Sequence, residues 1–125
     1  MKKLIAVAVA AMLLLTGCGG GGASSEDAIE KYGSDTLKVY NWGEYIGESV
    51  ISDFEKEFGV KVVYEVFDSN EMMYTKLQAG DAYDVLVPSD YMIERLMNEE
   101  MLQPLDLSLI PNISNLADGV KNLPY

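Results

Sequence analysis

Two short segments carry side chains whose types and spacing suit the binding of an organic cation. One holds a tryptophan, a glutamate and a tyrosine within four positions, and the other holds consecutive serine, aspartate and tyrosine. The candidate binding residues are Trp42, Glu44, Tyr45, Ser89, Asp90 and Tyr91. Aromatic faces attract ammonium groups by about 0.5–2 kcal/mol each, and carboxylates accept charge-assisted hydrogen bonds from them. An aromatic box with acidic ends therefore suits a linear alkyl polyamine.

The same residues also have a purely structural interpretation. Aromatic side chains near strand ends often do no more than close a hydrophobic core. Glu44 and Asp90 can be solvated charges, or acids of a first helical turn favoured by the helix dipole. Ser89 can be a helix cap alone. The residues by themselves leave both interpretations open.

Composition excludes several classes of function. The 125 residues carry a formal net charge of -11, which disfavours nucleic-acid binding and favours cationic ligands. The absence of histidine removes the Ser-His and Cys-His nucleophile pairs and the commonest zinc ligand. No calcium-binding loop of the EF-hand type is present either. Taken together, these absences lead us to expect no metal, no cofactor and no enzymatic activity.

The N-terminus is typical of a lipoprotein signal peptide. Lysines precede the apolar run Leu4–Leu15, which is too short for a transmembrane helix. The run leads into Thr-Gly and then Cys18, the only cysteine, which resembles a lipobox whose cysteine is lipidated and becomes the mature N-terminus. We therefore expect a signal peptide over 1–17 and a lipid-anchored flexible linker over 18–35.

The remaining residues, 36–125, alternate strand and helix patterns. The predicted strands are Thr36–Trp42, Val60–Phe67 and Tyr83–Val87. The first predicted helix is Glu48–Phe58, the second runs from Met72 through Leu77, and the third runs from an N-cap at Ser89 through Met97. Asp68 and Glu71 are expected to form a capping box before the second helix. Gly59 is expected just after the first helix, and the chain after Met101 is loop-like.

This alternation predicts the α/β class, with a parallel sheet and flanking helices. In a flavodoxin-like strand order the first and third strands are neighbours, and ligands bind beyond the carboxyl ends of the strands. Because the two candidate segments follow those strands, we expect them to face one another.

Residues 37–125 resemble the start of the spermidine/putrescine-binding proteins of ABC importers. The matching stretches are LKVYNWGEYIGESVISDFEKEFGVKVVYEVFDSNE, GDAYDVLVPSDYMIERL and MLQPLDLSLIPNISNL, in which YNW-x-EY and YD-x-x-VPS-x-Y are the specific segments. The resemblance implies a two-lobed, type II periplasmic-binding-protein fold. Its lobes close on a polyamine, and the closed form is presented to the permease subunits in the membrane.

The resemblance also implies roles for single residues. Trp42 and Tyr45 match an aromatic wall after the first strand, and Glu44 matches an acidic position that takes an ammonium end. Ser89 and Tyr91 match the site segment after the third strand. The segment Asp68–Glu71 also matches the family and is expected mainly to cap the helix, with ligand contact as the less favoured role.

The chain departs from the family pattern in three ways. Asp90 replaces an expected small residue, and it either adds an anionic contact or only starts the helix. Glu100 stands where a helix-ending glycine is usual. The chain also ends before the hinge and the second lobe, so 36–125 is expected to be the incomplete first part of lobe 1, with poor stability and negligible polyamine affinity alone.

The expected function is therefore that of the solute-binding component of a polyamine importer, present here as a fragment. Its ligand is expected to be spermidine or putrescine. It is expected outside the cytoplasm, anchored to the cell membrane through Cys18, and in the periplasmic space if the cell is Gram-negative. A surface lipoprotein or adhesin without a transport role is an alternative. A carboxylate-dependent hydrolase using Glu44 and Asp90 is the least favoured one.

Overall fold

A three-stranded parallel sheet lies at the centre of the computed structural model, which describes residues 22–121. Its strands are β1 (Thr36–Trp42), β2 (Lys61–Phe67) and β3 (Val85–Leu86). The order is β2-β1-β3, with both neighbouring pairs parallel. This confirms the predicted α/β class and the predicted adjacency of the first and third strands, although β3 is shorter than the sequence pattern suggested.

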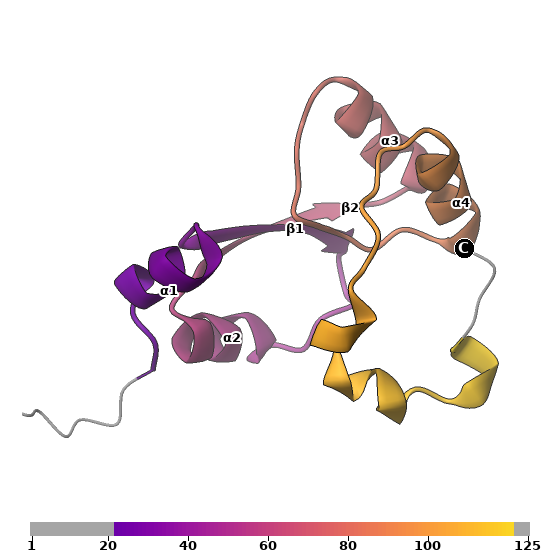
Figure 1. Cartoon of the computed structure of the whole chain (residues 1–125). Coiled ribbons are helices and arrows are strands. Elements are labelled where there is room, and N and C mark those ends of the chain that lie inside the picture. The colour runs from indigo at the N-terminus through magenta and orange to yellow at the C-terminus, as the bar shows by residue number, and fades with distance from the viewer. Residues whose placement is uncertain (1–21, 122–125) are drawn as a thin grey trace, which may run out of the picture.

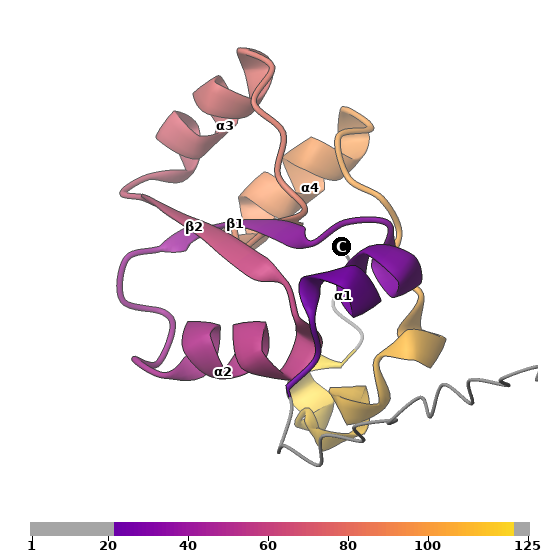
Figure 2. The ribbon, with the colours of Figure 1, turned by 90° about the vertical axis from the view of Figure 1, so that its left-hand side faces the viewer.

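Helices cover the two faces of the sheet in different numbers (Figures 1 and 2). Helix α2 (Val50–Phe58) lies against one face, whereas α3 (Asn70–Gln78) and α4 (Asp90–Asn98) lie against the other. As predicted, α2 ends at Gly59, whose φ of 68° is a left-handed conformation that glycine adopts without steric cost.

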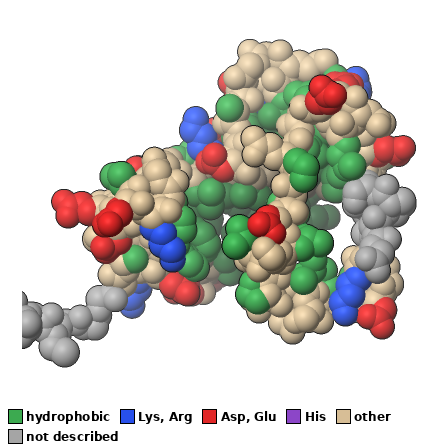
Figure 3. Space-filling model, in the orientation of Figure 1, with side chains coloured by type: hydrophobic (Ala, Val, Ile, Leu, Met, Phe, Trp, Pro, Cys, Tyr) green, Lys and Arg blue, Asp and Glu red, His purple; other side chains and the backbone are tan. Residues whose placement is uncertain are grey.

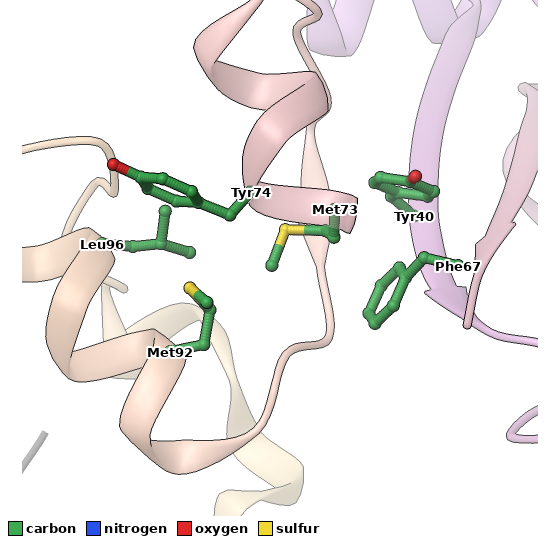
Figure 4. Packing of buried hydrophobic residues seen from close by; sticks show 6 residues of the cluster. All are labelled: Tyr40, Phe67, Met73, Tyr74, Met92 and Leu96. Carbon is green, nitrogen blue, oxygen red and sulfur yellow. The ribbon is translucent and has the colours of Figure 1, made fainter. Parts of the chain in front are cut away.

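The main cluster of buried hydrophobic side chains lies on the α3/α4 face. Tyr40 and Phe67 project from the strands, and their rings meet edge to face at a centroid distance of 4.9 Å. Side chains of α3 and α4 complete this cluster (Figure 4): Met73, Tyr74, Met92 and Leu96. Each fully buried apolar side chain contributes about 1.5–3 kcal/mol, so this face supplies most of the hydrophobic stabilisation.

A helix occupies part of the range expected to be a flexible linker. Helix α1 (Ser25–Tyr32) begins with a capping box, in which the Ser24 hydroxyl accepts a hydrogen bond from the Asp27 amide while the Asp27 carboxylate accepts one from the Ser24 amide. Ala28 is only 1% exposed. The expectation of a flexible segment through residue 35 is therefore wrong for these residues, because the Ser-x-x-Asp cap starts a helix here.

The start of α3 also differs from the prediction. Its N-cap is Ser69 rather than Asp68, and the Ser69 hydroxyl accepts a hydrogen bond from the Met72 amide at 3.2 Å. The expected Asp68–Glu71 capping box is therefore wrong. The Glu71 carboxylate is left available for a contact with another segment of the chain.

After α4 the chain forms three short 3-10 helices and no further strand among the described residues. These are η1 (Leu107–Leu109), η2 (Pro111–Asn115) and η3 (Asp118–Val120). Several of their hydrophobic side chains are exposed, including Leu109 at 78%, and such side chains are visible over this part of the surface (Figure 3).

The predicted signal peptide and Cys18 lie outside the described residues. Among residues 22–121, no helix has the length and hydrophobicity needed to cross a membrane.

Candidate functional site

The candidate residues follow two neighbouring strands at the carboxyl edge of the sheet. The pairing of β1 with β2 brings Trp42 beside Phe67, and Tyr40 pairs with Leu86 at the end of β3. The Val87 amide extends this alignment by donating a hydrogen bond to the Tyr40 carbonyl at 3.1 Å. The turn after β1 and the segment after β3 therefore leave the sheet at the same edge, as predicted from the strand order.

Trp42 and Tyr45 form an aromatic group at the end of β1. Their ring centroids are 6.0 Å apart, and the Trp42 ring also packs on buried Phe67 at 4.5 Å. The Tyr64 hydroxyl donates a hydrogen bond to the Trp42 carbonyl at 3.3 Å, which holds the strand end. Trp42 is thus half-buried against the core, whereas Tyr45 is 70% exposed. One face of this group is fixed and the other is open to a ligand.

Ser89 and Tyr91 form a second group at the start of α4. Ser89 is the N-cap residue, yet its side chain makes no capping hydrogen bond. Its hydroxyl instead accepts a hydrogen bond from the Asn70 amide group at 3.0 Å. The Tyr91 ring is 52% exposed, so the structural interpretation in which it seals the core does not apply to it.

Glu44 and Asp90 are both exposed carboxylates. Glu44 lies in the turn after β1, next to the aromatic group. Asp90 is the first residue of α4, and its carboxylate accepts a hydrogen bond from the Tyr91 amide at 2.8 Å. Asp90 therefore starts the helix, while its charge remains at the edge where the other candidates lie.

Asn70 and Glu71 are two residues of this edge that the sequence reasoning did not select. Asn70 is buried, at 5% exposure, and its side chain hydrogen-bonds to Ser89 and Tyr91. The Tyr91 hydroxyl donates a hydrogen bond to the Glu71 carboxylate at 3.0 Å. The one signal in the sequence is that Asp68–Glu71 belongs to a stretch that matches the family, although helix capping is its favoured role.

The phenol of Tyr91 has an unusual electrostatic environment. Partial desolvation raises the pKa of Tyr91 above its ordinary value, and the hydrogen bond to the Glu71 carboxylate raises it further. The hydrogen bond from Asn70 acts in the opposite direction. Tyr91 therefore remains a neutral phenol beside a carboxylate, which is compatible with a cationic ligand.

The structure thus brings the candidates to one edge in two groups. Trp42 and Tyr45 belong to the first and Ser89 and Tyr91 to the second, and no hydrogen bond or ring contact within residues 22–121 joins them. A hollow of about 350 Å³ lies instead near the amino ends of the strands, where Tyr32, Phe54 and Phe58 help to line it and no candidate residue does.

Comparison with known sequences gives consistent matches over part of longer proteins. The family model described as "Hypothetical lipoprotein (MG045 family)" matches residues 21–121. The spermidine/putrescine-binding periplasmic protein of Escherichia coli K12 is 42% identical over 94 residues, covering 74% of this chain and 27% of that protein. The spermidine/putrescine-binding periplasmic protein 1 of Haemophilus influenzae is 35% identical over 131 residues, covering 100% of this chain and 36% of that protein.

Solved structures give the same result. A putative spermidine/putrescine ABC transporter protein from Listeria monocytogenes matches with a TM-score of 0.65 and 52% identity, covering 67% of this chain and 26% of that one. The Tp0655 (TpPotD) lipoprotein of Treponema pallidum matches with a TM-score of 0.64 and 39% identity, covering 69% of this chain and 27% of that one.

These relatives are binding proteins rather than enzymes, and periplasmic proteins or lipoproteins among them indicate an extracytoplasmic location. The chain spans 27% to 36% of the length of the two curated relatives described above. The chain therefore belongs to the MG045 lipoprotein family and is a short homologue of the substrate-binding proteins of spermidine/putrescine ABC transporters.

Proposed function

We propose that this chain forms part of the ligand-capturing site of a polyamine importer, in which it binds one portion of a linear polyammonium ion. The observation that carries this proposal is the aromatic pair at the end of β1, in which Trp42 is half-buried and Tyr45 is exposed. This pair lies next to an exposed carboxylate and at the same sheet edge as Tyr91. Spermidine and putrescine are the ligand class named for the relatives.

The aromatic group suits the methylene segments and the ammonium ends of such a ligand. Tyr45 exposes most of its ring, whereas Trp42 is supported from behind by Phe67 at 4.5 Å. A ring held in this way covers apolar atoms at about 25 cal/mol per Å². It also attracts a nearby ammonium group through its electron-rich face.

The charges at this edge favour a cation. Glu44, Glu71 and Asp90 all lie on segments that follow or join the carboxyl ends of the strands, and all three are exposed. The whole chain carries a formal net charge of -11. A field of this sign raises the local concentration of polyamines and increases their rate of association.

We propose that a further lobe closes over the ligand and that a membrane permease receives it, as the resemblance to ABC-importer binding proteins implies. We propose also that lipid on Cys18 anchors the chain to the cell membrane. The lipoprotein descriptions of the matched family and of the Treponema pallidum relative support this anchor.

Trp42 is the only tryptophan of the chain, so tryptophan emission, excited selectively, reports on this position alone. We expect spermidine to change Trp42 emission only at millimolar concentration, where binding is worth about 4 kcal/mol, because the described residues offer two small contact groups at one sheet edge. Amide NMR signals of 42–45 and 89–91 are expected to shift together. Glu44→Gln is expected to weaken the effect.

A linear diol of equal length provides the uncharged control and is expected to leave the signals unchanged. Shifts confined to other parts of the chain, or an equal response to the diol, would contradict the proposal. The absence of any cation-dependent change at either segment would favour the adhesin alternative.

A further inference from the structure

The side chain of Asn70 joins the start of α3 to the segment after β3. Its Oδ1 accepts a hydrogen bond from the Ser89 amide at 3.0 Å. Its Nδ2 donates to the Ser89 hydroxyl at 3.0 Å and to the Tyr91 hydroxyl at 2.9 Å. Because a backbone amide can only donate, the contact with Ser89 identifies which atom of the Asn70 side chain is the oxygen.

This arrangement uses both amide hydrogens of Asn70 and one lone pair of its oxygen. At 5% exposure, the side chain has little access to water that could replace these partners. A buried polar group that loses its partner is strongly disfavoured, so Ser89 and Tyr91 are held in one arrangement relative to α3. The missing side-chain cap at Ser89 has the same explanation, since its hydroxyl faces Asn70.

Glu71, the next residue, fixes the remaining freedom of Tyr91. The Tyr91 hydroxyl accepts from Asn70, and it donates to Glu71 Oε1 at 3.0 Å. Its one hydrogen is therefore directed at the carboxylate, and the position of the phenol oxygen is defined from two sides. The ring remains 52% exposed, so the ring rather than the hydroxyl hydrogen is available to a ligand.

We propose that Asn70 and Glu71 are positioning residues of the ligand site, which hold Ser89 and Tyr91 in the geometry that receives the cation. This role in ligand binding rests on the proposed function. The geometry itself is testable without any ligand. It predicts that the segment after β3 is preorganised, which reduces the entropic cost of binding.

The first test measures amide hydrogen exchange of Ser89 by NMR in the full chain. Asn70→Ala removes the acceptor, and we expect exchange at Ser89 to accelerate at least about fivefold. Asn70→Asp keeps an acceptor oxygen, so the protection of Ser89 is expected to be largely retained. Ser69→Ala is the matched control, because it removes the α3 cap without touching Ser89. Equal acceleration in the Ser69 and Asn70 variants would overturn the proposal.

The second test follows the titration of Tyr91 by NMR of carbon-labelled tyrosine. Three side chains act on this phenol: Glu71, Asn70 and Asp90. Glu71→Gln removes the carboxylate that accepts its hydrogen, so the pKa of Tyr91 is expected to fall. Glu57→Gln makes the same charge change on α2 and is expected to leave Tyr91 unchanged. No shift in the Glu71 variant, or equal shifts in both, would contradict the assigned role.

The third test repeats the spermidine titration on the Asn70→Ala and Ser69→Ala variants. A positioning role predicts weaker binding in the Asn70 variant alone. If Ser89 exchange and Tyr91 titration respond as expected but spermidine binds neither variant nor the parent chain, the geometry stands and the proposed function fails. If the parent and both variants bind equally, the positioning role is wrong while the proposed function survives.

Discussion

The two faces of the sheet differ sharply in how well they are covered. On the α3/α4 face, the rings and aliphatic chains of the core reach 6% exposure or less. On the α2 face, α2 contains no buried residue, and Val66 and Val85 remain 53% and 41% exposed. The hydrophobic stabilisation is therefore concentrated on one side of a thin sheet.

This difference bears on the candidate site. The segment with Ser89 and Tyr91 starts a helix of the well-covered face and is tied to α3 through Asn70. The turn with Glu44 and Tyr45 leads instead into α2. Regions with few buried contacts open more readily than the core. We therefore expect the second group to be rigid and the turn after β1 to be the more adaptable part of the site.

The largest expected effect comes from truncating a core side chain on the α3/α4 face. Leu96 on α4 is fully buried, at 0% exposure. Leu96→Ala removes apolar contacts and leaves a cavity, so we expect the free energy of unfolding to fall by about 2–5 kcal/mol. Urea denaturation followed by circular dichroism measures this loss.

Phe54→Ala on the α2 face is the matched comparison. Phe54 is only half-buried, and it packs on Phe58 at a ring distance of 4.5 Å. Although more atoms are removed, we expect a smaller loss than for Leu96→Ala. An equal or larger loss for Phe54→Ala would show that the α2 face carries as much of the stability as the α3/α4 face.

Local signals in the sequence were sufficient for the sheet and for most helix ends. Strand periodicity located β1 and β2 closely, and Gly59 indicated the end of α2 because its left-handed conformation is a local property. The capping box at Ser24 is equally local, and it predicts α1 once Asp27 is considered with it.

The network around Asn70 could not be predicted in the same way. Its hydrogen bonds to Ser89 and Tyr91 span 19 and 21 residues. They depend on how α3 and α4 pack together, and periodicity carries no information about that packing. From the sequence, the favoured role of Glu71 is a capping box with Asp68, and the structure has Ser69 as the N-cap instead. The aromatic candidates were recognisable from type and spacing, but their division into two groups was not.

Breaking the polar contact between α3 and α4 is expected to cause a loss of stability of intermediate size that depends on pH. The Tyr74 hydroxyl donates to Glu99 Oε2 at 2.6 Å, and Arg95 donates to Oε1 at 3.0 Å. The hydrogen bond from Tyr74, followed by that from Arg95, holds the pKa of Glu99 below its ordinary value of 4.5. A carboxyl whose pKa is lower in the folded than in the unfolded state stabilises the fold at pH values above its unfolded-state pKa. This stabilisation is lost as the pH falls through the folded-state pKa.

Tyr74→Phe is therefore expected to lower the free energy of unfolding most near neutral pH and progressively less in acid. Urea denaturation at a series of pH values measures this loss. Tyr64→Phe on the opposite face is the control, because the Tyr64 hydroxyl donates to a backbone carbonyl that does not titrate in this range. A cost at Tyr74 that is independent of pH would contradict the assigned role of Glu99.

The smallest expected effects are opposite changes in the free energy of unfolding at the C-terminal ends of α3 and α4. Both α3 and α4 end in the same pair of hydrogen bonds: Asp81 to Lys76 and Gly80 to Leu77 in α3, and Met101 to Leu96 and Glu100 to Met97 in α4. This pattern is a Schellman motif, which requires a left-handed residue just after the helix. In α3 that residue is Gly80, with φ 100°, and in α4 it is Glu100, with φ 56°.

A residue with a Cβ loses about 1–2 kcal/mol in this conformation, whereas glycine loses about 0.5–1 kcal/mol more backbone entropy on folding. Glu100→Gly is therefore expected to raise the free energy of unfolding by about 0.5–1 kcal/mol, and the reverse change Gly80→Ala is expected to lower it by a similar amount. A Cβ at Gly80 would meet no atom within 4 Å, so that change tests conformation without a clash. If urea denaturation shows both variants shifting in the same direction, backbone strain is not what distinguishes the two helix ends.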